Sequence, residues 1–115
     1  MIEWNFIQSA EQIARLSADS YQKPVIIFKH SYSCGLSHIV LSRFEREFNA
    51  DCVGQFLLID VVKHRAVSQQ IAGYFQIEHA SPQILVLAAD EVLYSASHYG
   101  IDADAVQKAI KSLCK

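Results

Sequence analysis

One cysteine stands where the sequence could make a thiol reactive. Cys34 follows the apolar run Val25–Phe28 and the polar residues Lys29–Ser33, and a helical pattern begins directly after it. The free N–H groups and the dipole at a helix N-terminus favour negative charge, and the thiolate is the nucleophilic form of cysteine. The pattern therefore predicts that Cys34 is a reactive thiol. The alternative is an inert structural cysteine, since free cysteines are among the most buried residues.

The residue three places after Cys34 is a serine. In the stretch Cys34-Gly35-Leu36-Ser37 no second thiol is available to close a short disulfide. A mixed disulfide on Cys34 must then be resolved by an external thiol. Cys52 follows a predicted helix that is roughly 21 Å long, at about 1.5 Å per residue. We therefore expect Cys52 to lie out of reach of Cys34.

Two histidines flank the cysteine. His38 follows Cys34 by four residues, which places both on one helical face, and His30 ends the strand that precedes the cysteine. Either imidazole could carry a positive charge that favours the thiolate, or could be a partly buried polar residue. Cys34 and His38 also have the spacing of a metal-ligand pair, but the sequence shows no second pair to complete a zinc site. We expect no metal.

A second segment, centred on Pro82, is predicted to reach the same end of the sheet. Proline cannot donate to a strand ladder, so Pro82 marks the start of a strand. The Ser81–Pro82 bond is also of the type in which a cis peptide costs little. His79 and His98 are expected near the same end of the sheet.

These residues are positioned by alternating helices and strands. A capping box at Ser9–Gln12 begins a helix that ends near Ser20, and Asp102 is a plausible N-cap for the last helix. The predicted order is α-β-α-β-α-β-β-α, which implies an α/β fold with helices on both faces of a central mixed sheet of about four strands. This is the order of a thioredoxin-like domain. Between these two helices we expect strands at Val25–Phe28, Phe56–Ile59, Ile84–Leu87 and Val92–Ala96, and helices at Gly35–Phe48 and Ala66–Phe75.

In the thioredoxin fold, which this order of elements resembles, the proline that corresponds to Pro82 is cis and lies against the reactive cysteine. The resemblance therefore implies that Ser81–Pro82 is cis and packs near Cys34.

Size and charge narrow the class of protein. A chain of 115 residues fits a single domain spanning residues 1–115, and its net charge of −2 gives no reason to expect nucleic acid or a membrane surface as a partner. The first residues do not read as a signal peptide, and no apolar run is long enough to span a membrane. The three cysteines form no CxxC motif. We therefore expect a reducing, cytoplasmic setting.

Three ordered motifs carry a resemblance to a known family. The segments Lys29–Ser37, His79–Gln83 and Ser95–His98 together resemble the monothiol bacilliredoxin family (the YtxJ type), which has a thioredoxin-like fold. The resemblance covers nearly the whole chain. At Gly35 the sequence departs from the bulkier residues that many proteins of this fold carry.

The resemblance implies a thiol-disulfide oxidoreductase that removes bacillithiol, a small bacterial thiol, from mixed disulfides on client proteins. Cys34 would attack the bacillithiol sulfur, free the client and become thiolated, and a second small thiol would restore it. Ser81 and a cis Pro82 would form the wall of the thiol groove, and Ser37 would be the non-resolving position. The partners would be S-thiolated proteins and the small thiol, with no bound cofactor.

Two other functions stay open from the residues alone. The first is a glutaredoxin-like monothiol protein that uses glutathione or another small thiol. The second is a thioredoxin-fold binding or adaptor domain in which Cys34 is only a ligand site.

Overall fold

The chain folds as an α/β domain with the predicted order of helices and strands. The computed structural model describes residues 2–49, 54–111 and 113. Its strands are β1 (Asn5–Phe6), β2 (Val25–His30), β3 (Gln55–Asp60), β4 (Gln83–Ala88) and β5 (Glu91–Ser97). Its helices are α1 (Ala10–Asp19), α2 (Gly35–Glu47), α3 (Arg65–Phe75) and α4 (Ala103–Lys111), with a 3₁₀ turn, η1, at His98–Gly100.

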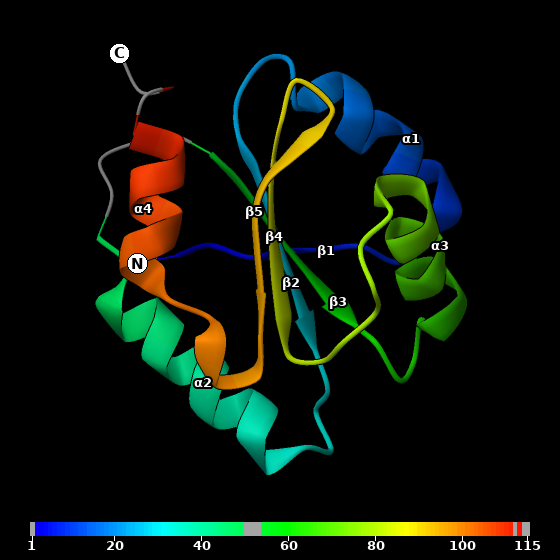
Figure 1. Ribbon diagram of the computed structural model, residues 1–115. Coiled ribbons are helices and arrows are strands. Elements are labelled where there is room, and N and C mark those ends of the chain that lie inside the picture. The colour runs from blue at the N-terminus through cyan, green and yellow to red at the C-terminus, as the bar shows by residue number, and fades with distance from the viewer. Residues whose placement is uncertain (1, 50–53, 112, 114–115) are drawn as a thin grey trace.

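The strands form one mixed sheet in the order β1-β3-β2-β4-β5. Strands β1, β3 and β2 are parallel, β4 is antiparallel to β2, and β5 is antiparallel to β4. The chain can enter β4 antiparallel to β2 because residues 76–82 carry it from α3 back to the end of the sheet at which β2 and β3 finish (Figure 1). The predicted mixed sheet is confirmed, with five strands instead of about four.

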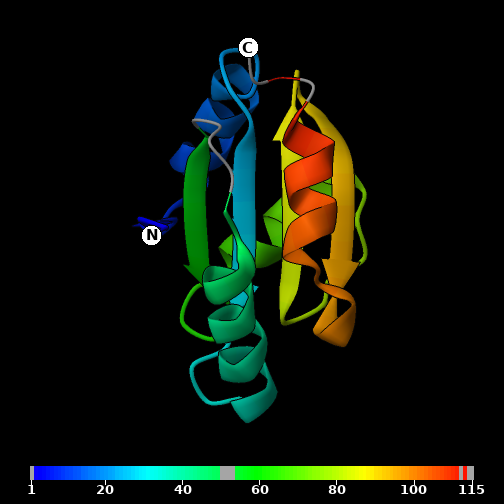
Figure 2. The same ribbon diagram turned by 90° about the vertical axis from the view of Figure 1, so that its left-hand side faces the viewer.

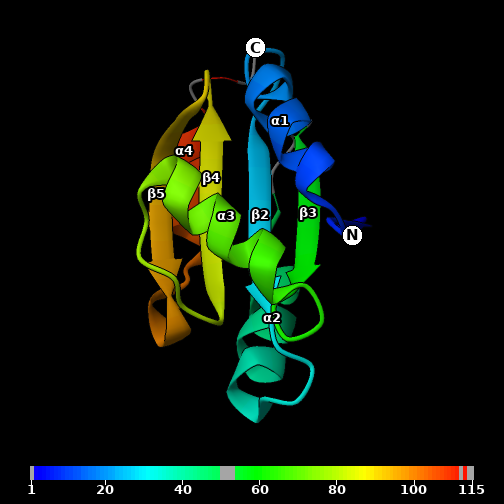
Figure 3. The same cartoon turned by 90° about the vertical axis from the view of Figure 1, so that its right-hand side faces the viewer.

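Helices cover both faces of the sheet, as predicted. Figure 2 shows α2 and α4 in front of one face, and Figure 3 shows α1 and α3 in front of the other. Successive side chains of a strand point to opposite faces. Accordingly, Phe28 packs in the cluster that contains Val40 of α2, whereas Ile27 packs in the cluster that contains Ile71 of α3.

The central strand β2 runs two residues further than its apolar stretch. The sequence predicted a strand at Val25–Phe28, but the structure continues it through Lys29 and His30, which are 0% and 1% exposed. Lys29 pairs in register with Ile59 and Gln83, and His30 pairs with Asp60. A lysine and a histidine are therefore enclosed at the end of the strand that leads to Cys34.

Two predicted helix starts are confirmed in their hydrogen bonds. At the start of α1, the backbone N–H of Ser9 donates to Oε1 of Gln12 at 3.1 Å. Before α4, Oδ1 of Asp102 accepts the N–H of Asp104 at 3.0 Å. Within the described ranges, no helix has the length and apolar character needed to cross a membrane.

Candidate active site

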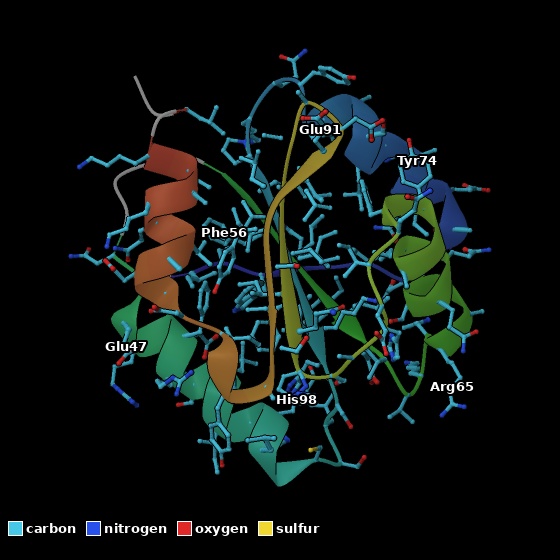
Figure 4. All side chains as sticks on the ribbon, viewed as in Figure 1. Glu47, Phe56, Arg65, Tyr74, Glu91 and His98 are labelled. Carbon is cyan, nitrogen blue, oxygen red and sulfur yellow. The ribbon has the colours of Figure 1, made fainter. Side chains whose placement is uncertain are left out.

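The predicted site residues gather at one end of the sheet. Strands β2 and β3 finish there, β4 begins there, and α2 starts beyond it (Figure 1). Gln83 pairs with Lys29 on one side and with Ser97 on the other. The Ser81–Pro82 segment therefore enters the sheet between the end of β2 and the end of β5. Figure 4 labels His98 at this lower end, directly after β5.

Cys34 is the N-cap residue of α2. Its backbone is extended (φ −109°, ψ 117°), its N–H donates to the carbonyl of Ser31 at 3.2 Å, and its carbonyl accepts the N–H of His38 at 3.3 Å. The Cys34 side chain is a half-buried free thiol. A Cβ atom added to Gly35 would meet no other atom within 4 Å, so the first residue of α2 faces open space. The cysteine sits at the helix N-terminus, as predicted.

Ser37 is a buried anchor for the turn that carries Cys34. Its side chain is 0% exposed, and its Oγ accepts the backbone N–H of Ser31 at 3.1 Å. The same oxygen lies 2.6 Å from Nδ1 of His30. Ser37 thus joins the end of β2 to the first turn of α2. The sequence contained a signal that Ser37 is buried. Ser37 precedes Val40 by three residues and Phe44 follows Val40 by four, so all three lie on one face of the helix.

His30 is a buried histidine. Its ring lies edge-on to Tyr32 and His38, with centroid distances of 4.4 and 4.7 Å. Burial first, and then the charge of His38, lower the pKa of His30 below its ordinary value of 6.5, against smaller opposing effects of Asp60 and Glu45. Of the two roles left open for His30, the structure supports the buried polar residue.

His38 and Ser33 brace the turn from its exposed side. A carbonyl oxygen can only accept, so Nε2–H of His38 donates to the carbonyl of Tyr32 at 2.8 Å. The hydroxyls of Ser31 and Ser33 lie 3.2 Å apart. Across the described ranges, no hydrogen bond or ion pair joins a histidine to the Cys34 side chain. No group of three or more potential metal ligands occurs in this part of the chain.

The Ser81–Pro82 peptide bond is cis, as predicted. The carbonyl of Pro82 accepts the N–H of His98 at 2.9 Å, and Nε2 of Gln83 donates to the carbonyl of Glu78 at 2.9 Å. Among the residues that the structure describes, the backbone N–H and C=O of Ser81 have no hydrogen-bond partner.

His98 has a left-handed backbone. Its φ is +56°, which is uncommon for a residue other than glycine, and its side chain is exposed. Residues held in such conformations are concentrated at functional sites. The hydrogen bond from its N–H to the carbonyl of Pro82 places His98 at the end of the sheet that the sequence predicted.

Lys29 was named within a sequence motif without a role for its side chain, and Ser68 was missed. Nζ of Lys29 donates to the carbonyl of Ser68 at 3.1 Å and lies 3.3 Å from Nδ1 of His79. Burial lowers the pKa of Lys29 to about 8. Burial, and then the charges of Lys29 and Arg65, lower the pKa of His79. Lys29 follows Val25 and Ile27 at the strand spacing of two, and that spacing was the available signal that its side chain points inward.

Several buried polar atoms at this end have no hydrogen-bond partner within the described part of the chain. They are Nε2 of His30, Oγ of Ser81 and Oε1 of Gln83. Buried polar groups are normally paired, so each of these atoms has hydrogen-bonding capacity left for a water molecule or a ligand. The arrangement offers a thiol at a helix start, at the end of the sheet where β4 begins, which is chemistry suited to thiol-disulfide exchange.

Solved structures similar to this chain share the thioredoxin fold. One is a protein with a thioredoxin fold for which oxidoreductase activity has been proposed, with a TM-score of 0.76, 22% identity and 92% of each chain covered. Thioredoxin from Malassezia sympodialis has a TM-score of 0.70 at 18% identity, covering 97% of this chain and 94% of its own. A mutant thioredoxin from Halobacterium salinarum NRC-1 has a TM-score of 0.65 at 17% identity, covering 98% and 92%. These likenesses confirm the predicted fold.

The family profile described as monothiol bacilliredoxin BrxC matches residues 5–106. The match spans the Cys34 turn, the Ser81–Pro82 segment and the end of β5. It confirms the family resemblance seen in the three sequence motifs. The chain is therefore a thiol-disulfide oxidoreductase that belongs to the monothiol bacilliredoxin BrxC family.

Proposed function

We propose that this protein removes bacillithiol from mixed disulfides on client proteins, with Cys34 as the nucleophile. The observation that carries the proposal is the position of the Cys34 thiol, half-buried at the start of α2 and at the end of the sheet where the Ser81 backbone is free. Membership of the bacilliredoxin family supports bacillithiol as the small thiol.

The proposed reaction is one thiol-disulfide exchange followed by a second. The Cys34 thiolate attacks the bacillithiol sulfur of the mixed disulfide, the client–bacillithiol S–S bond breaks, and the client sulfur leaves as a thiolate that takes up a proton. Cys34 is then joined to bacillithiol. A second bacillithiol thiolate attacks that sulfur, restores Cys34, and leaves as the bacillithiol disulfide. No bound cofactor takes part, because each step exchanges one S–S bond for another.

Two surfaces would hold the substrate in line for attack. The free N–H and C=O of Ser81 can pair with the extended backbone on either side of the client cysteine, in the manner of strand addition. His98, exposed beside Pro82, would contact the small thiol or the client from the far wall. Ser37 has no sulfur, so the thiolated Cys34 would wait for the second small thiol.

The partners in this proposal are S-thiolated proteins and free bacillithiol in the cytoplasm of a bacterium. The other candidate, a glutathione-using monothiol protein, has the same chemistry at Cys34. The two functions differ in the small thiol that the groove accepts, and the test must therefore compare small thiols directly.

The experiment is a rate comparison on one client protein prepared with either bacillithiol or glutathione on its cysteine. Release of the client thiol and the mass of the reductase are followed after rapid mixing. We expect faster release from the bacillithiolated client and no transfer with Cys34→Ser, while Cys52→Ser and Cys114→Ser retain it. Faster release from the glutathionylated client would select the alternative, and full activity in Cys34→Ser would overturn both.

A further inference from the structure

Lys29 is a buried lysine that makes no ion pair with any residue the structure describes. Its side chain is 0% exposed, and no carboxylate of a described residue lies within ion-pairing distance of Nζ. The two contacts of Nζ are the carbonyl of Ser68 on α3 and the imidazole of His79. Burying an ammonium group without a counter-ion is costly, and an apolar side chain of similar volume would avoid that cost. The hydrogen bonds that Lys29 makes therefore need an explanation beyond packing.

His79 contacts this ammonium group with one ring nitrogen. Its ring is exposed, yet Nδ1 lies 3.3 Å from Nζ of Lys29 and 3.2 Å from Oγ of Ser68. An ammonium group can only donate, so Nδ1 must be the acceptor and the ring proton must be on Nε2. Burial, and then the charges of Lys29 and Arg65, lower the pKa of His79 below its ordinary value of 6.5. The contact is thus directional, with a fixed donor and a fixed acceptor.

The same lysine fastens the Ser81–Pro82 segment on both sides. Its side chain holds His79, which precedes Ser81 by two residues, and its backbone pairs in register with Gln83, which directly follows Pro82. Residues 79–83 therefore form a short loop closed upon one residue of β2. The carbonyl of Pro82 is then held by the N–H of His98 on the far side.

Lys29 and the residue that follows it make contacts on opposite faces of the sheet at this end. Figure 4 labels Arg65, at the start of α3, and His98, after β5, in the lower half of the molecule. Lys29 lies on the α3 face of β2, whereas His30, the next residue, lies on the α2 face and contacts Ser37. Adjacent residues of one strand thus hold the loop on one face and the Cys34 turn on the other.

We propose that Lys29 is a positioning residue for thiol-disulfide exchange, and that it acts through His79 to set the Ser81–Pro82 segment against the substrate. The inference rests on the proposed function, because it assumes that the Ser81 backbone binds the mixed disulfide. Lys29 itself touches neither the reacting sulfurs nor the substrate.

The test separates binding at the Ser81–Pro82 segment from the reactivity of the thiol by using two reactions of Cys34. Exchange with a bacillithiolated client needs that segment in the proposed function, whereas alkylation by iodoacetamide, a small reagent, needs only the thiol. Lys29→Met keeps the volume of the side chain and removes its donors. We expect Lys29→Met to lower the second-order rate constant of exchange about tenfold while alkylation stays within about twofold, since misplaced binding groups commonly cost such factors. Lys23→Met, at an exposed lysine far from the cluster, is the matched control and keeps both rates.

Exposed His79 supplies variants that do not depend on changing the core. His79→Ala removes the acceptor and should slow exchange as Lys29→Met does, whereas His79→Asn keeps an acceptor atom near the Nδ1 position and should restore most of the rate. The double variant should be no slower than Lys29→Met alone, because both substitutions break the same contact.

The outcomes distinguish this inference from the proposed function. If the wild-type protein does not exchange with the thiolated client, the proposed function fails and the inference fails with it. If the wild type exchanges but Lys29→Met and His79→Ala match it, or slow alkylation by the same factor as exchange, only the positioning role is overturned. Equal rates for His79→Ala and His79→Asn would also contradict it.

Discussion

Ser37 is the residue whose role changes most between sequence and structure. In the sequence, Ser37 was notable because a serine at this position cannot form a disulfide with Cys34. In the structure its hydroxyl is fully buried and contacts both Ser31 and His30, so that it fastens the Cys34 turn to α2. The two roles are compatible, since a cysteine at this position would add a thiol and weaken the anchor.

Ser37→Ala should therefore lower the unfolding free energy clearly while it lowers the transfer activity only slightly. The substitution leaves a buried N–H of Ser31 and a buried Nδ1 of His30 without a partner, which should cost about 2 kcal/mol of unfolding free energy. The folded variant should keep most of its transfer activity, because Ser37 is not a thiol. Urea unfolding and client release measure the two effects. Ser95→Ala, at an exposed serine of β5, is the control and should change stability by less than about 0.5 kcal/mol.

His30 makes the folded protein sensitive to acid. Because its pKa is lowered below 6.5 in the folded state, the unfolded chain binds a proton in the range below 6.5 that the folded chain does not. Stability should thus fall as the pH falls through this range, and His30→Gln should show a weaker fall. Unfolding free energies measured at a series of acidic pH values check the slope. Identical slopes for the two proteins would show that His30 is not the responsible group.

At the scale of elements, the sequence predicted the helices and the buried strands well because their apolar patterns are long and regular. Two elements escaped it. Strand β1 has only two residues, Asn5 and Phe6, which is too short for alternation to be visible. The turn η1 depends on the left-handed backbone of His98, a non-glycine residue for which local sequence gives little warning.

The end of β2 escaped for a different reason. Charged and polar residues such as Lys29 and His30 normally stop a buried strand, and here tertiary contacts override that tendency. Lys29 finds acceptors on Ser68 and His79, and His30 is held by Ser37. Ser68 and His79 are distant from Lys29 in sequence, and Ser37 reaches His30 only because helix α2 begins at Gly35. The thiol could be predicted from local order, whereas the hydrogen bonds that shape its surroundings could not.

Arg43 links helix α2 to the 3₁₀ turn η1, which carries His98. Nη2 of Arg43 donates to the carbonyls of Tyr99 and Ile101, which hold η1 against the helix. Arg43→Met should lower the unfolding free energy by about 1–2 kcal/mol, because two charged hydrogen bonds are lost. It should also slow exchange severalfold, since η1 carries His98 and its bond to Pro82.

Arg46→Met is the matched control for this substitution. Arg46 lies on the same helix and is exposed, and its replacement should leave both quantities nearly unchanged. Denaturant unfolding and the exchange rate are the measurements. Equal losses in the two variants would show that the contact with η1 is not what matters.

At the scale of the whole molecule, the buried charge of Lys29 should appear in the pH dependence of global stability. Its pKa is about 8 when folded and 10.5 when free, so the unfolded chain binds more protons between these values. Stability therefore rises with pH across this window, where the folded state loses the cost of burying the charge.

A comparison of the wild type with Lys29→Met isolates this effect. Other groups titrate in the same range, but they do so in both proteins. The unfolding free energy of the wild type, minus that of Lys29→Met, should increase by up to about 3 kcal/mol as the pH is raised from 8 to 10.5. Chemical denaturation across that range measures the difference. A difference that is independent of pH would mean that Lys29 is not buried as a charge.

The central claim is that Cys34 alone accepts the small thiol from a client protein. The most direct measurement is the intact mass of a Cys52→Ser/Cys114→Ser variant, in which Cys34 is the remaining cysteine, after mixing with an equimolar bacillithiolated client. The account predicts that the variant gains the mass of one bacillithiol while the client loses it. A client that keeps its bacillithiol, with the variant unchanged in mass, would contradict the account.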